Sequence, residues 1–298
     1  MTNERTIRHA AMPVIVGVPR SGTTLLRFML DAHPILAIPP ETTFLPAAYG
    51  LLQTGRDTRE DLLDLLTAFP REAPAWPDFG LEPLELQEEF RKIHPFGLGE
   101  GLRAFYRLYA SKQNKPRYGD KTPSYCEHIP SIASLLPEAH FIHIIRDGRD
   151  VAMSLRKVWF APGHDVPTLA RYWRRLVRGA RDAGCVSRAY MEIRYEDLVT
   201  EPQSQLEAIT RFLSIPFDSS MLRYFERTPE RLKEHRARVR VDGAVLVSHE
   251  QRLWQQRLTT QSLQRSRVFQ WKREMSEAER AEFVLYAGDT LEELGYNV

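Results

Sequence analysis

The 298-residue chain has little of what several classes of protein require. Its two cysteines, Cys126 and Cys185, are too few for a disulfide framework and lack the spacing of a metal site. We expect both to be small buried side chains in a protein of the reducing cytoplasm. No stretch approaches eighteen apolar residues, so no membrane span is expected, and the polar residues 1–8 lack the apolar centre of a secretory signal.

The chain also lacks a strong imbalance of charge. It has 41 Lys and Arg against 39 Asp and Glu, a formal net charge of +2, which argues against binding to nucleic acid through bulk charge. No group of Asp, Glu or His has the spacing of a metal site, so no metal cofactor is expected. A length of 298 residues is sufficient for one large α/β domain, and an apolar fraction of 43% is ordinary for a soluble globular protein.

The most informative stretch lies near the N-terminus. Residues 14–18 are apolar and mostly β-branched, which predicts a buried strand, and residues 24–32 have the apolar spacing of a helix. A tight loop with Gly17 and Gly22 joins them. Backbone N–H groups and the helix dipole meet at such a junction, which therefore predicts a phosphate-binding site.

This loop almost matches the P-loop of ATP-binding proteins, but it lacks the lysine of that motif. Gly17, four residues and Gly22 are followed by Thr23 and Thr24, where the motif requires Lys and then Ser or Thr. Arg20 instead offers a planar fork that binds oxyanions at two points. The loop therefore predicts a phosphate other than the end of a nucleoside triphosphate. A strand, turn and helix with incidental small residues stays an alternative for this loop alone.

Strands alternate with helices over more than 200 residues. This order predicts a P-loop-type parallel β-sheet flanked by helices on both faces, in a single domain over residues 13–298 after a tail of residues 1–12. Residues 70–83 contain four prolines, and we expect them to form a surface connection or a mobile lid. The predicted strands after the first cover residues 35–38, 117–122, 139–145 and 189–193. The predicted helices after the first cover residues 44–52, 59–69, 84–93, 101–111, 151–158, 168–181, 203–213, 219–227 and 276–294.

Several polar side chains follow the predicted strands. Glu41, Lys121 and Arg146 each lie where a strand ends, and ligands bind at the carboxyl edge of such a sheet. Ser154 lies eight residues after Arg146, about two helical turns on, so that the pair could hold a second phosphate. The alternative for the Arg146 region is a capped turn closed by ion pairs. On residue type alone, Lys121 would be a surface lysine and Glu41 a helix-start carboxylate.

Taken together, these motifs resemble the sulfotransferases that use 3′-phosphoadenosine-5′-phosphosulfate (PAPS). Residues 19–24 resemble the family's 5′-phosphosulfate loop, and Arg146 with Ser154 resembles its 3′-phosphate motif. Residues 30–34 resemble the bacterial and tyrosylprotein branches in particular. The resemblance implies PAPS as the donor, 3′-phosphoadenosine-5′-phosphate (PAP) as the product and no metal. It implies that the cofactor is bound by Arg20, Ser21, Gly22, Thr23, Thr24, Arg146, Ser154 and Tyr195.

The same resemblance implies three catalytic residues. Glu41, twenty-one positions after Arg20, matches the catalytic glutamate of tyrosylprotein-type enzymes, and Lys121 matches their lysine. Arg20 and Lys121 would stabilise the transition state. Thr43 stands where those enzymes have an arginine, and we expect no membrane anchor like theirs. The acceptor therefore stays open: a hydroxyl of a small molecule, glycan, lipid or peptide tyrosine. A homodimer also stays open.

The C-terminal part of the cofactor site is expected at about residues 245–272. Residues there that resemble the family's C-terminal loop in position or basic character are Ser248, Arg257, Ser262, Arg265, Ser266, Arg267 and Trp271. Arg171, Arg174, Arg175 and Arg178 predict a basic helix face, which is either solvated or meets an acidic partner. The rival functions are a P-loop kinase or NTPase and a non-catalytic protein that binds phosphoadenosine nucleotides.

Overall fold

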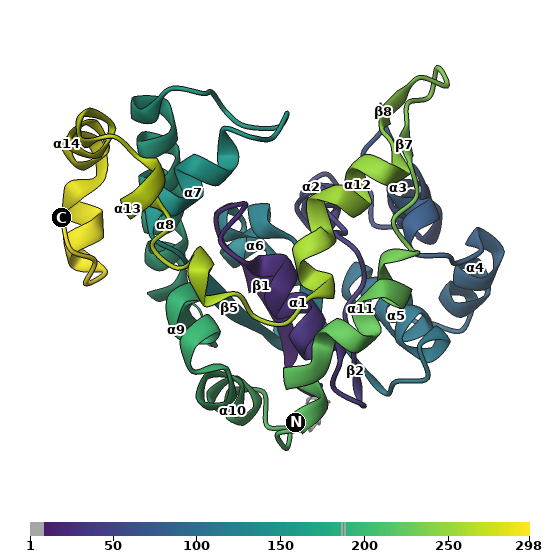
Figure 1. The fold of residues 1–298 in the computed structure, drawn as a ribbon. Helices are drawn as coiled ribbons and strands as arrows, with labels where there is room; N and C mark the ends of the chain where they lie inside the picture. Colours follow the sequence, from purple (N-terminus) through teal and green to yellow (C-terminus); the bar gives the residue numbers. More distant parts are fainter. Residues whose placement is uncertain (1–8, 186, 188) are drawn as a thin grey trace.

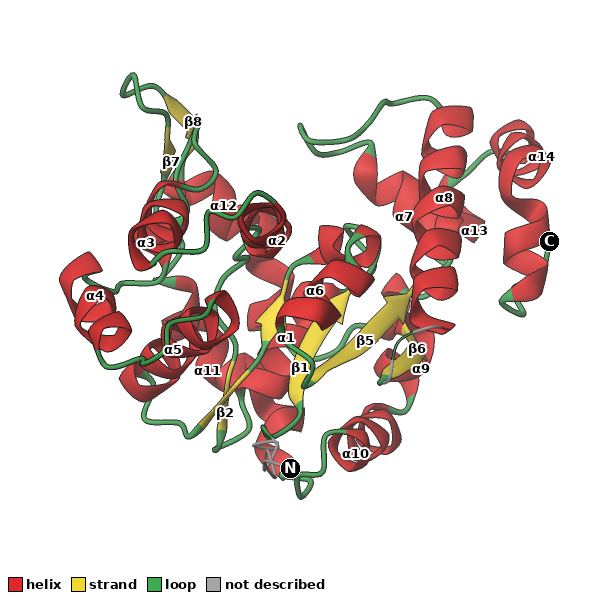
Figure 2. Cartoon of the chain, turned by 180° about the vertical axis from the view of Figure 1, so that it is seen from behind, coloured by secondary structure: helices red, strands yellow, loops and turns green. Residues whose placement is uncertain are grey.

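A computed structural model describes residues 9–185, 187 and 189–298. Its central feature is a four-stranded sheet with all strands parallel, in the order β4-β1-β5-β6 (Figures 1 and 2). Two short strands form a separate parallel pair, β2 with β3, and β7 pairs antiparallel with β8. The bounds are β1 Met12–Val16, β2 Leu36–Ala37, β3 Arg117–Tyr118, β4 Asp120–Lys121, β5 Ala139–Ile145, β6 Tyr190–Arg194, β7 Arg238–Val239 and β8 Val245–Val247.

The sheet is buried on both faces, which explains the unbroken apolar runs of its strands. Val14 of β1 and Phe141 of β5 belong to one hydrophobic core, whereas Ile15 and Ile142 belong to the other. Side chains alternate across a strand, so that the two cores lie on opposite faces. The prediction of a single α/β domain with helices on both faces is confirmed.

Helices pack into both cores (Figure 2). The first core contains side chains of α2 Leu45–Gln53, α3 Arg59–Ala68, α4 Pro83–Arg91, α5 Leu98–Lys112, α6 Ile129–Leu135, α7 Gly148–Leu155, α8 Val166–Cys185, α13 Trp271–Glu274 and α14 Glu277–Glu293. The second contains side chains of α1 Thr23–Asp31, α9 Tyr195–Thr200, α10 Pro202–Phe212 and α11 Tyr224–Leu232. The remaining α-helix is α12 His249–Gln256, and 3₁₀ helices cover Trp76–Asp78, Pro123–Glu127, Ser219–Arg223, Arg257–Thr260 and Arg265–Arg267.

Two predicted elements differ from the structure for local reasons. The strand predicted over residues 117–122 is divided, because β3 pairs with β2 while β4 pairs with β1. Gly119 lies between them, and a Cβ there would approach the Pro13 carbonyl oxygen to 2.8 Å. The helix predicted from residue 151 begins at Gly148 instead. The Asp147 carboxylate accepts a hydrogen bond from the Arg149 N–H and so caps the first turn.

The proline-rich residues 70–83, expected to form a surface connection or a mobile lid, combine exposed and buried side chains. Trp76 and Phe79 are buried, and their rings pack against Phe105 at centroid distances of 6.1 and 5.0 Å. Asp78, between them, is 2% exposed and accepts hydrogen bonds from Arg252 at 2.8 Å. This part of the connection is therefore anchored in the core. Movement of the segment as a lid stays a prediction.

The predicted basic face of α8 meets acidic residues of the same chain. Arg174 and Arg178 form ion pairs with Asp289 of α14 at 2.6 and 3.1 Å, and Arg178 also pairs with Glu293 at 2.6 Å. α14 begins at the predicted capping box of Ser276 and Glu279. Arg174 and Arg178 therefore belong to an intramolecular contact between two helices, whereas Arg171 and Arg175 are exposed, so the expected solvated face holds for part of the stripe.

Three smaller predictions can also be compared. Cys126 is buried as expected, but Cys185, at the end of α8, is exposed. β1 begins at Met12, inside the expected tail, whose residues 1–8 lie outside the described part of the chain. Among the described residues, no helix is long and apolar enough to cross a membrane.

Candidate active site

The carboxyl ends of the four parallel strands bring most of the predicted site residues to one edge of the sheet, whereas Glu41 lies four residues after β2, which is outside this sheet. β1 leads into the glycine-bounded loop, and Lys121 is the last residue of β4. Arg146 directly follows β5, and Tyr195 directly follows β6 as the first residue of α9. Because the strands are parallel and adjacent, side chains that lie far apart in the sequence meet at this edge.

The loop between β1 and α1 is tightly constrained. Gly22 has φ +100°, and a Cβ there would lie 2.5 Å from the Tyr195 ring, so the close packing of loop and ring requires glycine. Arg20 also has a left-handed backbone, with φ 76°. Ser21 is fully buried, and its hydroxyl has no hydrogen-bond partner among the described residues. The Ser21 side chain therefore points into the protein interior, whereas Thr23 and Thr24 line the cleft.

Arg20 and Arg146, the two arginines on which the sequence interpretation depends, lie on one surface. The Arg20 Nε donates to the Ser154 hydroxyl at 3.0 Å, and an Arg146 Nη donates to the Arg20 carbonyl at 3.4 Å. The Arg146 guanidinium stacks on the Tyr195 ring, 4.4 Å from its centroid. It also donates to Asp150 at 3.1 Å. Arg146 thus forms an ion pair with Asp150 and also lines the cleft.

A group of cations gathers here with few acidic partners. Burial lowers the pKa of the Arg20 guanidinium below its usual range, and the positive charges of Arg146, Arg257 and Arg267 lower it further. The Nε of Arg146 is buried without a hydrogen-bond partner among the described residues. Clustered buried cations repel one another unless an anion joins them. The arrangement is therefore suited to phosphate groups.

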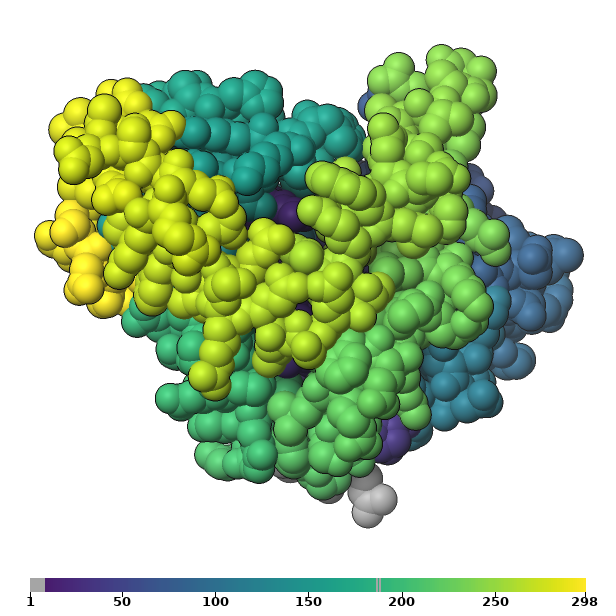
Figure 3. All heavy atoms as spheres, in the orientation of Figure 1, coloured from purple at the N-terminus to yellow at the C-terminus, as the bar shows by residue number. Residues whose placement is uncertain are grey.

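These residues line the first of two neighbouring pockets, which we call the arginine pocket. It is lined by Arg20, Gly22, Thr23, Thr24, Arg146, Ser154, Tyr195 and Tyr224, and by Gln255, Gln256, Ser262, Gln264 and Arg267 of the C-terminal segment. Figure 3 shows this yellow-green segment lying across the purple N-terminal residues. Arg257 lines an adjoining part of the cleft.

Other residues expected in the C-terminal part of the site have structural contacts instead. Ser248 caps α12, and Arg265 donates to the Thr200 carbonyl at 3.0 Å. Trp271 is buried, and its backbone and indole N–H groups donate to Asp150 and Asp147. The basic composition of residues 245–272 could not distinguish residues that line the pocket from residues with structural contacts, because composition does not show which side chains point into the pocket.

The second pocket, the glutamate pocket, shares Arg20, Thr23 and Thr24 with the first. Lys121, 2% exposed, forms an ion pair with the Glu41 carboxylate and donates to the Thr24 hydroxyl at 3.3 Å. Burial opposes ionisation of Glu41, but the charge and hydrogen bond of Lys121, together with the positive charges of Arg252 and Arg238, outweigh it and lower the pKa of this carboxyl. Burial lowers the pKa of Lys121, an effect that Glu41 partly offsets. Glu41 is therefore a carboxylate that can accept a proton.

The sequence interpretation missed the far wall of this pocket. His235, Arg238 and Arg252 line it together with two aromatic residues at its mouth, Trp159 and Phe160, which are 63% and 40% exposed. The two aromatic residues belong to the loop after α7, whereas Arg238 and Val247 belong to the β7–β8 hairpin, and Figure 1 shows where these two segments lie. A charged stretch at residues 231–240 was visible in the sequence, but nothing in it indicated which residues face the cleft. Within the described residues, no group of three His, Cys, Asp or Glu side chains is placed to hold a metal ion.

Comparison with known proteins agrees with this geometry. A model of the sulfotransferase family matches residues 14–219, which include most of β1, the loop, Arg146 and Tyr195. Zebrafish protein-tyrosine sulfotransferase 1 is 30% identical over 226 residues, 72% of this chain and 57% of the relative. Protein-tyrosine sulfotransferase A of Caenorhabditis elegans is 30% identical over 219 residues, 70% and 51% of the two chains. The chain thus spans about half the length of these relatives.

Solved structures show the same fold. The sulfotransferase domain of the Synechococcus PCC 7002 olefin synthase superposes with a TM-score of 0.61, 23% identity and 97% of both chains covered. A mouse sulfotransferase complexed with PAP superposes with a TM-score of 0.51, 14% identity and coverage of 96% and 86%. The protein belongs to the sulfotransferase family, as the sequence resemblance indicated.

Proposed function

We propose that the protein transfers a sulfuryl group from PAPS to an acceptor hydroxyl, with Glu41 as the general base. The observation that carries the proposal is the shared wall of the two pockets. Arg20, Thr23 and Thr24 of the phosphate loop belong to both, and the Glu41–Lys121 pair stands directly beyond them. A donor held in the first pocket would thus present its reactive end to the second.

The arginine pocket fits a nucleotide that carries two phosphates. The loop offers the N-terminal N–H groups of α1 and the guanidinium of Arg20, and Arg146 with Ser154 offers a second set of donors. The unpartnered Arg146 Nε is consistent with a hydrogen bond that a phosphate would complete. The mouse neighbour, which was solved with PAP, supports the same assignment.

In this proposal PAPS supplies the sulfuryl group, and the residues of the glutamate pocket act on the acceptor. Glu41 removes the proton of the acceptor hydroxyl through its carboxylate, which contributes typically 10²- to 10⁴-fold to such a step. Lys121 and Arg20 place positive charge where oxygens become more negative. The lysine ammonium also holds the carboxylate in position. Residue types, burial and pocket membership support these roles.

The acceptor is the least constrained part of the proposal. The relatives named above are protein-tyrosine sulfotransferases, so a tyrosine-bearing peptide is the first acceptor to test. Trp159 and Phe160 offer aromatic surface at the pocket mouth, which suits a phenol ring. Thr43, in place of the arginine of tyrosylprotein-type enzymes, keeps small-molecule, glycan and lipid hydroxyls in the test panel.

The test combines turnover with nucleotide binding. The protein is incubated with labelled PAPS and with a tyrosine peptide, a simple phenol, a glycan or a hydroxylated lipid, and mass spectrometry detects the added sulfonate. We expect Glu41→Gln to reduce transfer by roughly 10²- to 10⁴-fold while the affinity for PAP stays within about twofold. The exposed Glu282→Gln serves as the matched control. Unchanged transfer by Glu41→Gln would remove the carboxylate from the mechanism.

The same assays separate the rival functions. Turnover of Mg·ATP would favour a P-loop kinase or NTPase, although Thr23 stands where that motif needs lysine. Binding of PAP without transfer to any acceptor would favour a non-catalytic nucleotide-binding protein. Fractionation and sedimentation test the cytoplasmic location and the homodimer, which we retain as predictions.

A further inference from the structure

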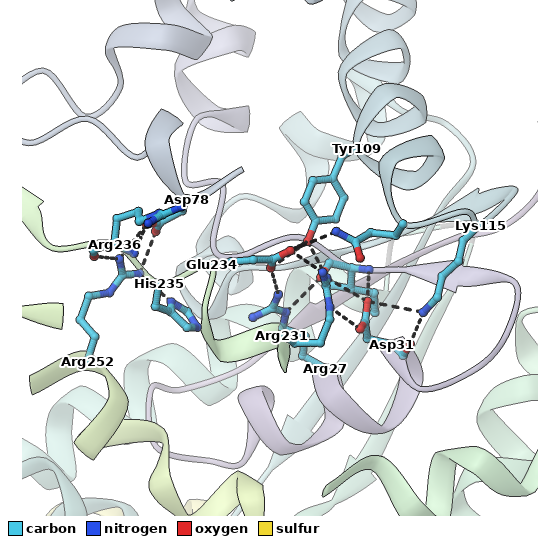
Figure 4. A network of polar contacts seen from close by, with 12 residues as sticks. Arg27, Asp31, Asp78, Tyr109, Lys115, Arg231, Glu234, His235, Arg236 and Arg252 are labelled. Atoms are coloured by element: carbon cyan, nitrogen blue, oxygen red, sulfur yellow. Dashed lines mark hydrogen bonds and ion pairs between the residues drawn. The ribbon is translucent and has the colours of Figure 1, made fainter. Parts of the chain in front are cut away.

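A buried polar network lies behind the glutamate pocket and joins three walls of the cleft (Figure 4). α1 begins at the phosphate loop and contributes Arg27 and Asp31, which are 1% and 3% exposed. α11 and the turn after it contribute Arg231 and Glu234, next to His235 of the pocket wall. The third wall is the segment that carries Glu41. Arg27, Asp31, Arg231 and Glu234 line neither pocket.

The network is centred on the backbone of Ile38, immediately after β2. The Ile38 N–H donates to the Asp31 carboxylate at 2.8 Å. The Ile38 carbonyl accepts from the Arg27 Nε at 3.0 Å and from an Arg231 Nη at 3.3 Å. Arg231 also binds Asp31 through its Nε at 2.8 Å. Both backbone polar groups of one residue are thus held by buried charged side chains.

The fixed backbone of Ile38 is joined to Glu41 by only two residues. Pro39 and Pro40 separate Ile38 from the glutamate, and proline rings fix φ near −65°, so the connection is stiff. On the far side, the Thr42 N–H donates to the Thr122 hydroxyl at 3.2 Å, and the Thr42 hydroxyl donates to Asp120 at 2.6 Å. The segment of Glu41 is therefore fixed at both ends, and only the Ile38 end depends on α11.

The opposite end of the network is equally well connected. The Tyr109 hydroxyl donates to Glu234 at 3.0 Å, and burial raises the pKa of Tyr109 so that the hydroxyl keeps its proton. Arg231 donates to the same carboxylate and to Tyr109. Charged groups buried in this way are costly unless all are paired, so the network favours a single arrangement.

We propose that Arg231 is a positioning residue, which holds the Ile38 backbone and so fixes the direction of the Glu41 carboxylate relative to Lys121 and the phosphate loop. This inference rests on the proposed role of Glu41 as base. Misplacement of a catalytic group by about 1 Å can cost on the order of 10²-fold in rate. Loss of Arg231 should therefore slow transfer although the side chain contacts neither donor nor acceptor.

The test compares two substitutions with a matched control. Arg231→Lys keeps the positive charge beside Asp31 and Glu234, but a single ammonium cannot replace the fork that also reaches the Ile38 carbonyl. Arg231→Met removes both the positive charge and the guanidinium fork. Arg227→Met, four residues earlier on the same helix, removes an exposed arginine outside the network. If Arg231→Met does not fold, Tyr109→Phe loosens the same network with the loss of one hydroxyl.

Two measurements decide the proposal. Hydrogen exchange of the Ile38 amide should be faster in Arg231→Lys and Arg231→Met, with exchange over residues 17–24 unchanged. The turnover number with PAPS and a tyrosine peptide should fall roughly tenfold to a hundredfold in both, with PAP affinity retained within about twofold. Equal protection of Ile38 in Arg231→Met, or full recovery of turnover in Arg231→Lys, would refute the positioning role. Failure of Glu41→Gln to lose transfer would instead refute the proposed function, and the exchange result would stand separately.

Discussion

At the scale of single residues, His143 shows how burial turns an ordinary side chain into a determinant of stability. This residue of β5 is fully buried and shares a hydrogen bond of 2.6 Å with the Tyr190 hydroxyl through its Nδ1. Burial, with a smaller effect of Arg181, lowers the pKa of His143 to about 3. The predicted strand at residues 139–145 was confirmed, but a buried neutral histidine inside it could not be inferred from an apolar run alone.

The lowered pKa of His143 determines the direction in which the free energy of unfolding changes with pH. The pKa of His143 is lower in the folded chain than its ordinary value of 6.5, so the unfolded chain binds more protons between pH 6.5 and pH 3. The free energy of unfolding should therefore fall as the pH falls through this range. We expect a shallower fall in His143→Gln, measured by urea unfolding at a series of pH values. The exposed His164→Gln should keep the slope of the unchanged protein, and an equal slope in both variants would contradict the prediction.

At the scale of elements, the junction of β1 and α1 was predictable because its signals are local. Gly17 and Gly22 bound the loop at positive φ, and the helix begins at Thr23, one residue from the predicted start. The sequence could not show why Gly22 is required. Its Cα faces the Tyr195 ring, which follows a strand more than 150 residues later. Tertiary packing adds this second constraint to the backbone conformation.

Two substitutions distinguish a glycine that the backbone and close packing require from a glycine in open space within a helix. Gly22→Ala places a methyl group 2.5 Å from the Tyr195 ring on a left-handed backbone. We expect it to cost about 1–3 kcal/mol of stability and to weaken PAP binding at least tenfold. Gly179→Ala, in open space within α8, should instead stabilise by about 0.5–1 kcal/mol. Thermal unfolding and PAP titration measure both. Unchanged PAP affinity in Gly22→Ala would argue against the loop as the phosphate site.

At the scale of the whole molecule, the arginine pocket joins parts of the chain that are distant in sequence. Arg20, Arg146 and Arg267 come from the N-terminal loop, the centre and the C-terminal segment, yet all three line the same pocket. A ligand that binds only the folded chain stabilises it, by about 2.7 kcal/mol at a concentration one hundred times its dissociation constant. Binding of a nucleotide should therefore be visible as global stabilisation.

We expect saturating PAP to raise the melting temperature by several degrees. Arg146→Met should lose most of this increase, because it removes one charge and the stack on Tyr195. Arg91→Met, at an exposed position of α4, should keep it. Scanning calorimetry with and without PAP gives both values. The same increase in Arg146→Met as in the unchanged protein would exclude this arginine from the nucleotide site.

The sequence by itself determined the strand–loop–helix that begins at β1, the alternation that makes a parallel sheet, and the positions of Lys121 and Arg146 at strand ends. These features depend on local conformation and on periodic burial, which neighbouring residues specify. Only the tertiary structure decided that residues 70–83 enter the core, that the basic face of α8 meets α14, and that Arg231 holds the backbone near Glu41. These are contacts between residues far apart in the chain, and a side chain's charge does not reveal its partner until folding brings the two together.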